Sequence, residues 1–210
     1  MTWHDGLRST ASDGTDLGHV RGMWEIDGAS RHMGIEVLDL DRVDGLGQSV
    51  ASMTITDTMV NGHGTTHGGM VFTFCDSVFA LTCNSSGVTT VAAHCDIDFL
   101  AATQLGDVLV GVGTERFRWG RNGMTDVVVR RAPRAGERPA GSAAKGQARA
   151  TGRAQRVMRH PLPCAVVTRF RQTWRPGRSS RSSPGGARRC HHAECAAGAR
   201  ATRRIVDQRG

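Results

Sequence analysis

The stretch from Asn61 to Cys83 constrains the fold most, because a loop rich in glycine and histidine runs directly into an almost wholly apolar segment. From Met70 to Leu81 apolar residues fall on every side of a helical wheel, so no polar stripe is left to face water. This pattern predicts a helix that is buried all round. One carboxylate, Asp76, stands in the middle of it.

Two features of this helix point to chemistry. An ionised carboxylate is costly to bury without partners, so Asp76 is a candidate catalytic group, with a capping role for a neighbouring turn as the alternative. At the helix start, Gly68 and Gly69 are expected to present bare backbone N–H groups at the positive end of the helix dipole. Such a site suits an anion or a developing oxyanion. The combination predicts an active site on one helix.

Five short motifs carry a resemblance to a known family. They are Asn61-Gly62-His63, His67-Gly68-Gly69, Asp76, Cys83-Asn84-Ser85 and the run from Asp96 to Leu100. From roughly Val20 to Val129 their order and spacing resemble those of the PaaI-type acyl-CoA thioesterases, the hot-dog enzymes of phenylacetate breakdown.

The resemblance implies an enzyme that hydrolyses phenylacetyl-CoA or a hydroxyphenylacetyl-CoA. A thiolate leaves readily, so one carboxylate suffices for catalysis. On the family pattern Asp76 is the base or nucleophile, the amide of Gly68 from the other subunit holds the carbonyl, and Asn61 and His67 position water or the thioester. Coenzyme A is part of the substrate, and no cofactor is expected. The resemblance also implies a homodimer with two interface sites, often doubled to a tetramer.

The phosphates of coenzyme A call for basic residues near the mouth of the site. Arg116, Arg118 and Arg121 are the candidates, with exposed charges at a strand edge as the alternative. After Leu100 the family commonly continues with a basic residue and a proline, whereas this chain has Ala101-Ala102. This departure concerns how the nucleotide end is held and does not affect the acid chemistry.

The loop histidines admit two further interpretations. His63 is expected to hydrogen-bond the loop backbone. A metal site formed by His63, His67 and Asp76 is not expected, because the two histidines flank glycines in a loop and do not lie on one face of a helix. Two other functions stay open: a hot-dog hydratase or dehydratase that uses a loop histidine with Asp76, and a non-catalytic acyl-CoA-binding module.

Periodicity and turn signals predict one α+β domain over residues 1–131. A short helical stretch interrupted at Gly28 precedes a strand pair joined through Asp44-Gly45, and the central helix ends near Asn84. The predicted elements are a helix at 20–32 and strands at 33–40, 48–56, 89–99, 108–118 and 124–130, the last two joined by a hairpin at 120–123. The resemblance implies a hot-dog fold, an antiparallel sheet wrapped around one long central helix.

Charge divides the chain near Arg131. Residues 1–131 carry a net charge of −7 and residues 132–210 carry +15, with only seven Leu, Ile, Val and Phe residues in the second part. This composition predicts a disordered basic tail over 132–210, with residues 143–149 as a degraded final strand. We hypothesise that the reading frame changes shortly after Arg131. The competing interpretation is a polycationic arm that binds nucleic acid non-specifically.

Cysteine usage and hydropathy indicate the compartment. Residues 1–20 lack the apolar core of a signal peptide, and no run approaches the length of a membrane span, so a cytoplasmic protein without membrane partners is expected. Cys75, Cys83 and Cys95 are expected to be reduced core residues. Cys190-His191-His192 with Cys195 is interpreted as a chance resemblance to half a zinc site.

Overall fold

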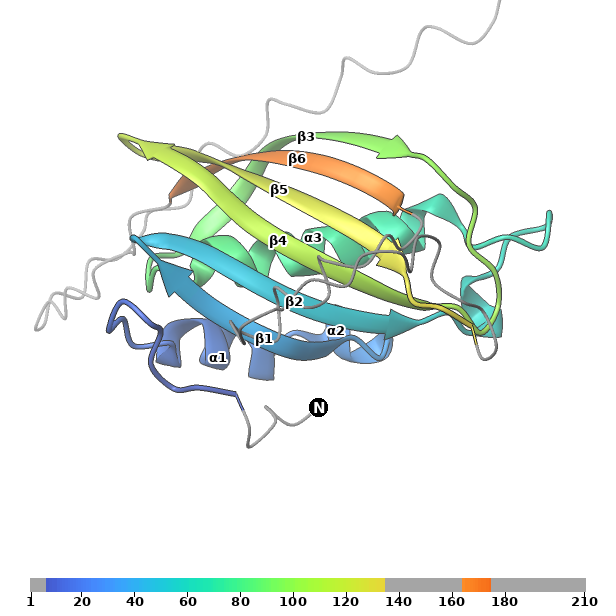
Figure 1. The fold of residues 1–210 in the computed structure, drawn as a ribbon, viewed down its shortest axis with the longest axis horizontal. Helices are drawn as coiled ribbons and strands as arrows, with labels where there is room; N and C mark the ends of the chain where they lie inside the picture. The colour runs from blue at the N-terminus through green and yellow to red at the C-terminus, as the bar shows by residue number, and fades with distance from the viewer. Residues whose placement is uncertain (1–6, 135–163, 175–210) are drawn as a thin grey trace, which may run out of the picture. The chain divides into compact units, whose positions relative to one another are not determined.

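The helix predicted around Asp76 is α3 (Gly68–Asn84), and it packs against a six-stranded antiparallel sheet in the computed structural model (Figure 1). The structure describes residues 7–134 and 164–174. α3 contacts β2, β3, β4, β5 and β6, so the sheet wraps around the helix as expected. The strands are β1 (Glu36–Val43), β2 (Leu46–Thr54), β3 (Thr90–Phe99), β4 (Val108–Trp119), β5 (Asn122–Arg131) and β6 (Cys164–Trp174).

The sheet order is β1-β2-β4-β5-β6-β3, with every neighbouring pair antiparallel. β1 and β2 are joined at Asp44 and Gly45, both with positive φ (52° and 77°), as a two-residue hairpin turn requires. β4 and β5 meet at Gly120 and Arg121, two residues before the predicted Asn-Gly step. Within the described residues β3 pairs only with β6, so one edge of β3 is open.

Polar side chains fix both ends of α3. His67 precedes the helix in an extended conformation and caps it, as described below. At the other end the amide of Asn84 donates to the carbonyls of Ala80 and Thr90, and Asn84 Oδ1 accepts from the N–H of Thr90 at 2.8 Å. One asparagine therefore ends the helix and starts β3, as the predicted stop near Asn84 requires.

Glycines on the sheet let α3 approach closely. A Cβ built at Gly113 of β4 would lie 2.0 Å from the hydroxyl oxygen of Thr82, and one at Gly47 would lie 2.0 Å from the carbonyl oxygen of Thr82. Neither position tolerates a side chain without a shift of the helix.

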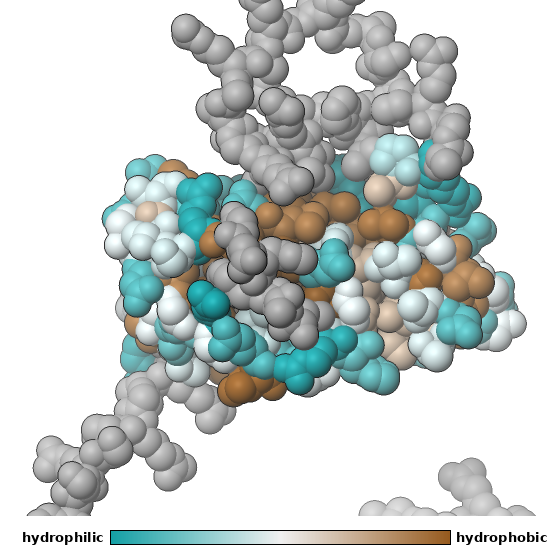
Figure 2. All heavy atoms as spheres, turned by 90° about the horizontal axis from the view of Figure 1, so that it is seen from below, coloured by the Kyte–Doolittle hydropathy of each residue, from teal (hydrophilic) through white to brown (hydrophobic). Residues whose placement is uncertain are grey.

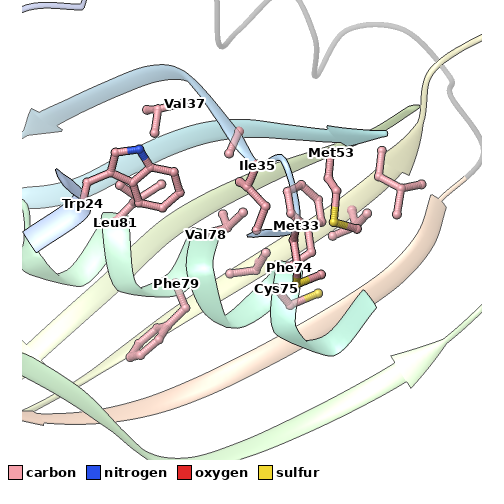
Figure 3. Close-up of a cluster of buried hydrophobic side chains, with 14 of the residues drawn as sticks. Trp24, Met33, Ile35, Val37, Met53, Phe74, Cys75, Val78, Phe79 and Leu81 are labelled. Atoms are coloured by element: carbon pink, nitrogen blue, oxygen red, sulfur yellow. The ribbon is translucent and has the colours of Figure 1, made fainter. Parts of the chain in front are cut away.

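The core lies between α3 and the sheet and contains Trp24, Ile35, Met53, Phe74 and Leu81 (Figure 3). The prediction of a helix buried on all sides is wrong for the single chain. Phe72 is 36% exposed, and Gly69 and Asp76 are exposed on the same face of α3. We call this face, defined by Gly69, Phe72 and Asp76, the open face of α3. An apolar surface of this kind is expected to be covered by another surface.

Two short helices, α1 (Gly18–Glu25) and α2 (Gly28–His32), replace the single predicted helical stretch, and the break falls where Gly28 indicated it. Trp24 is buried, whereas Ile26, just after the end of α1, is 83% exposed. Figure 2 shows the molecule from below relative to Figure 1, and on this face hydrophobic residues lie between hydrophilic ones. None of the helices in the described part of the chain is long and apolar enough to span a membrane.

β6 corrects the predicted domain boundary at residue 131. Phe170 is fully buried and its ring stacks on Phe79, with centroids 4.4 Å apart. The side chain of Gln172 accepts from Thr125 and donates to the buried carboxylate of Glu115. The folded unit therefore includes Cys164–Trp174, and the prediction of disorder is wrong for these residues. The rest of the tail beyond Arg134, including 143–149 and Cys190 to Cys195, lies outside the described residues, and the change of frame stays a hypothesis.

A charged cluster ties β6 to the outer strands. The carboxylate of Asp126 on β5 accepts from Arg169 of β6 at 2.7 Å and from Arg116 of β4 at 2.8 Å. Partial burial acts to raise the pKa of Asp126, but the hydrogen bonds from both arginines outweigh it and leave the pKa lowered. Three adjacent strands are thus joined through one ionised carboxylate.

Candidate active site

The amide of Gly68 is a free donor at the start of α3. Its N–H makes no hydrogen bond to any other described residue, whereas the N–H of Gly69 donates to Nδ1 of His67 at 3.0 Å. The expectation of two bare glycine amides is therefore wrong for Gly69. One unsatisfied N–H at the positive end of a 17-residue helix is suited to donate a hydrogen bond to a carbonyl oxygen that gains negative charge.

His67 has a structural partner that its motif did not reveal. Because Nδ1 accepts from the Gly69 amide, the neutral ring carries its proton on Nε2. The ring thus caps the helix and leaves one N–H donor for another group. Its predicted role in positioning water or the thioester stays a prediction that only Nε2 can fill.

The side chain of Asn61 organises its own loop. Its Oδ1 accepts from the N–H of His63 at 2.9 Å, and its Nδ2 donates to the hydroxyl of Thr65 at 3.1 Å. These contacts form a local turn that brings the chain to His67. The expected contact between Asn61 and substrate stays a prediction, and the ring of His63 is exposed.

Asp76 lies on the open face of α3 and not in the interior of the chain, which corrects the predicted burial. Protein on one side still removes part of the hydration of its carboxylate, and this desolvation, followed by the negative charge of Asp27, raises the pKa of Asp76. A raised pKa makes the carboxylate a stronger base, as a group that activates water requires.

Asp27 is a second carboxylate at this site, and no motif predicted its role. It caps α2 by accepting from the N–H and the hydroxyl of Ser30 at 3.0 and 2.6 Å. The Ser30 hydroxyl in turn lies 2.8 Å from that of Ser77, the neighbour of Asp76. Hydrogen bonds therefore fix the position of Asp27 relative to the helix that carries Asp76.

The other titratable groups that interact with Asp76 are thiols. Burial raises the pKa of Cys75 to about 12 and that of Cys83 well above its usual value, and loss of hydration also raises the pKa of Cys95 on β3. All three thiols are free; Cys75 and Cys83 are buried as predicted, whereas Cys95 is only partly buried. Asp27 is thus the ionised neighbour that affects the titration of Asp76.

The three predicted CoA-binding arginines lie at the other end of α3 from Gly68 within the same chain. Arg118 binds the buried carboxylate of Glu115 and donates to the carbonyl of Cys83, near the helix C-terminus. Arg116 pairs with Asp126, while Arg121 is exposed in the turn between β4 and β5. Their role in CoA binding stays a prediction.

Gly68 and Asp76 of one chain are too far apart to act on one carbonyl. Eight residues at 1.5 Å per residue separate them by about 12 Å along the helix axis, whereas reacting atoms must approach to about 3–3.5 Å. The predicted site, in which Gly68 and Asp76 act on one carbonyl, therefore requires the two residues to come from different chains. Within residues 7–134 and 164–174 no cluster of three or more His, Cys, Asp or Glu side chains could hold a metal ion.

A sheet wrapped around one long helix is the hot-dog fold that the family resemblance implied. The family model described as "Thioesterase superfamily" matches residues 63–136. The acyl-coenzyme A thioesterase PaaI of Escherichia coli is 35% identical over 111 residues, which cover 53% of this chain and 76% of that protein. The chain belongs to the PaaI-type acyl-CoA thioesterase family and is a thioester hydrolase.

Solved structures support the same fold. The E. coli PaaI protein from the phenylacetic acid degradation operon aligns over 76% of this chain and 93% of its own, with a TM-score of 0.59 and 26% identity. A Streptococcus pneumoniae thioesterase protein solved with coenzyme A aligns over 67% of this chain and 87% of its own, with a TM-score of 0.50 and 19% identity. The second likeness concerns the fold alone.

Proposed function

We propose that the chain hydrolyses phenylacetyl-CoA or a hydroxyphenylacetyl-CoA to the free acid and CoA in phenylacetate catabolism. The observation that carries this proposal is the unsatisfied N–H of Gly68 at the start of the helix that also bears Asp76. The acyl group is inferred from the E. coli relative, the PaaI protein of the phenylacetic acid degradation operon. The free thiols of Cys75, Cys83 and Cys95 fit a reducing compartment such as the cytoplasm.

The enzyme works as a dimer in this proposal. The open edge of β3 offers unpaired backbone groups, and the open face of α3 exposes Phe72 beside Asp76. A two-fold axis that pairs these surfaces in antiparallel fashion brings Gly68 of one subunit toward Asp76 of the other. This arrangement covers the apolar side of α3. It also brings a Gly68 and an Asp76 together at one site, although within one chain they lie about 12 Å apart along the helix. A dimer of such dimers is the larger assembly that the family resemblance implies.

In the reaction the Gly68 amide holds the thioester oxygen while Asp76 attacks the carbonyl carbon or removes a proton from a water that does so. Negative charge develops on the oxygen at the positive helix end. The C–S bond then breaks, and CoA leaves as the thiolate. Where water was the nucleophile, the free acid forms in this step and the proton on Asp76 passes to the thiolate; where Asp76 attacked, water then cleaves the acyl–Asp76 anhydride to give the free acid and restore the carboxylate. Desolvation and the charge of Asp27 raise the pKa of Asp76, which makes its carboxylate a stronger base.

The first test is release of free thiol from phenylacetyl-CoA by the full-length chain and by Asp76→Asn. Removal of the base is expected to lower kcat by about 10²–10⁴-fold. Asp44→Asn is the matched control, because it makes the same chemical change in an exposed turn where asparagine also accepts the positive φ. A parent that is folded but releases no thiol from any acyl-CoA would contradict the proposal, and hydration of an enoyl-CoA instead would identify a hydratase.

The second test asks whether each site is shared. Gly68→Pro deletes the donor with little change to the helix, because proline is favoured at the first helical position and His67 already has the extended conformation (φ −63°, ψ 127°) that a residue before proline prefers. Gly68→Ala keeps the N–H and is the control. Mixed and refolded Gly68→Pro and Asp76→Asn chains are expected to regain about a quarter of parental activity, since half the dimers are then mixed and each has one intact site. No recovery would contradict a shared site.

A further inference from the structure

Two large aromatic side chains are exposed at the end of β4 that leads into the turn with β5 (Figure 1). Phe117 and Trp119 are 48% and 45% exposed, and their ring centroids lie 5.3 Å apart at an interplanar angle of 34°. Single exposed apolar residues are ordinary on a protein surface, whereas neighbouring ones often mark a binding site. Both rings lie outside the core and outside the candidate active site.

Strand pairing places these rings on the outer face of the sheet, the face turned away from α3. Phe117 is paired with Met124 of β5, and Met124 is paired with Arg171 of β6. Residues paired across antiparallel strands lie on the same face. Because Thr125 and Gln172, the next residues along β5 and β6, are buried, Phe117, Met124 and Arg171 form a row on the outer face.

Exposed arginines surround the rings. The side chains of Arg116 and Arg169 are 52% and 58% exposed, and both bind the single carboxylate of Asp126, so these three groups together carry one positive charge. Arg121 in the turn and Arg171 in the row are exposed as well. The part of the outer face that carries the rings is therefore cationic.

Positive charge is concentrated at this end of the sheet. The exposed acids Asp96 and Asp98 are on β3, which is separated from β5 by β6. Thr173 of β6 is paired with Asn122 at the turn, and β6 ends one residue later. The sequence then continues with residues 175–210, which contain nine arginines and two acidic residues. This basic segment thus begins at the end of the sheet that carries the rings.

We propose that this aromatic face, defined by Phe117, Trp119, Met124 and Arg171, binds single-stranded nucleic acid. Proteins that bind single strands without sequence preference stack bases on exposed aromatic rings and hold the phosphates with cationic side chains. Phe117 and Trp119 are two residues apart on one strand, about 7 Å, so each ring can stack on a separate base. A duplex hides the faces of its bases and offers phosphates alone. The proposal does not depend on the proposed function.

A second copy of this chain is a less suitable partner for the aromatic face. A two-fold axis through the face would bring the arginines of one copy toward those of the other, and like charges in contact are unfavourable. A single strand supplies the two groups that match the face, flat bases for the rings and phosphates for the arginines.

Fluorescence anisotropy tests the proposal with the full-length protein. The probes are a fluorescein-labelled oligothymidylate of about twelve nucleotides, within the usual site size, and the duplex of the same length. Trp119→Ala should raise the Kd of the single strand at least about fivefold, the lower limit for the loss of one stacked base, and leave that of the duplex within about twofold. Trp119→Phe keeps a ring and should stay within about threefold of the parent.

The salt dependence separates stacking from phosphate contacts. Arg171→Ala should reduce the slope of log Kd against log salt by about 0.7, the value for one phosphate contact of a single strand, whereas Trp119→Ala should leave the slope unchanged. Ile26→Ala removes an equally exposed apolar side chain elsewhere and should leave the Kd and the slope as in the parent. Phe117→Ala serves as the second ring variant if circular dichroism shows that Trp119→Ala is unfolded.

Four results would overturn the proposal. The first is that the parent does not bind the single strand. The second is that the ring variants bind both probes as the parent does, because the basic tail alone then accounts for binding. The third is that Trp119→Ala weakens self-association in sedimentation and leaves nucleic-acid binding intact, which would identify an interface between copies. The fourth is that free CoA displaces the single strand and Trp119→Ala raises the KM for phenylacetyl-CoA, which would assign the face to the thioester.

Discussion

Replacement of Phe170 by alanine tests whether β6 is part of the hydrophobic core. The Phe170 side chain is fully buried, its ring stacks on Phe79 at 4.4 Å with an interplanar angle of 13°, and it contacts Phe72 at 6.3 Å between centroids. Truncation of a buried phenylalanine costs about 3–5 kcal/mol through lost transfer energy and the cavity that remains. Because whole domains are stable by only about 5–15 kcal/mol, Phe170→Ala should lose a large part of the free energy of unfolding.

The assay is urea unfolding followed by circular dichroism, at one protein concentration because the proposed dimer would couple stability to concentration. The midpoint should fall while the slope with urea stays the same, and Tm should fall by about 6–20 °C. Arg171→Ala, an exposed neighbour on the opposite face of β6, should change stability by less than about 0.5 kcal/mol. An equally small effect of Phe170→Ala would refute the placement of β6 in the core.

Three other predictions concern contacts of α3, the charged cluster and the catalytic base. Gly113→Ala should destabilise by about 1–3 kcal/mol in urea unfolding, because its Cβ would lie 2.0 Å from a helix side chain, whereas Gly22→Ala, with open space around it on α1, should be neutral or stabilising. Asp126 has a lowered pKa, so its contribution to stability is present above the unfolded pKa near 4 and lost as the pH falls through the folded pKa. Asp126→Asn should therefore be less stable than the parent at pH 7, and denaturant titrations at several pH values should show the difference closing below about pH 4. Asp27→Asn keeps a helix cap but removes a negative charge, so the pKa of Asp76 should fall and the acid limb of the kcat/KM profile should move to lower pH. An unmoved limb would refute a direct charge effect.

Local signals in the sequence account for most of the sheet. The alternation along β2, the Asp44-Gly45 turn and the hairpin near Gly120 predicted strands whose ends differ from the observed ones by a few residues. Each signal acts over two to ten residues, and the tertiary structure does not override it. The stop at Asn84 is equally local, although its role in starting β3 depends on Thr90 and could not be predicted.

β6 escaped prediction because composition was averaged over too long a segment. Three of the seven Leu, Ile, Val and Phe residues between 132 and 210 lie within Val166 to Phe170. Inward-facing Val166, Thr168, Phe170 and Gln172 alternate with exposed residues in the structure, which is a period-two pattern inside a basic stretch. A short window would have detected this strand, whereas its place between β5 and β3 follows from long-range pairing that no local signal encodes.

The open face of α3 shows a different limit of sequence reasoning. A helix that is apolar on every side predicts complete burial, but the wheel does not say whether the covering surface belongs to the same chain. Phe72 and Asp76 are left open by the sheet of their own chain. The error in the predicted burial of Asp76 is therefore informative, since it identifies the face that a second subunit covers in the proposed dimer.

The same reasoning joins stability to catalysis at this face. Covering Phe72 would stabilise a dimer through apolar burial, and it would also remove water from Asp76, whose pKa is already raised by the protein on one side. Dimer formation should thus raise the pKa of Asp76 further and strengthen it as a base. The Gly68 amide of the partner subunit, which has no other acceptor, would then lie where charge develops. A single exposed strip of α3 can in this way select the assembly and activate the acid only when the assembly is complete.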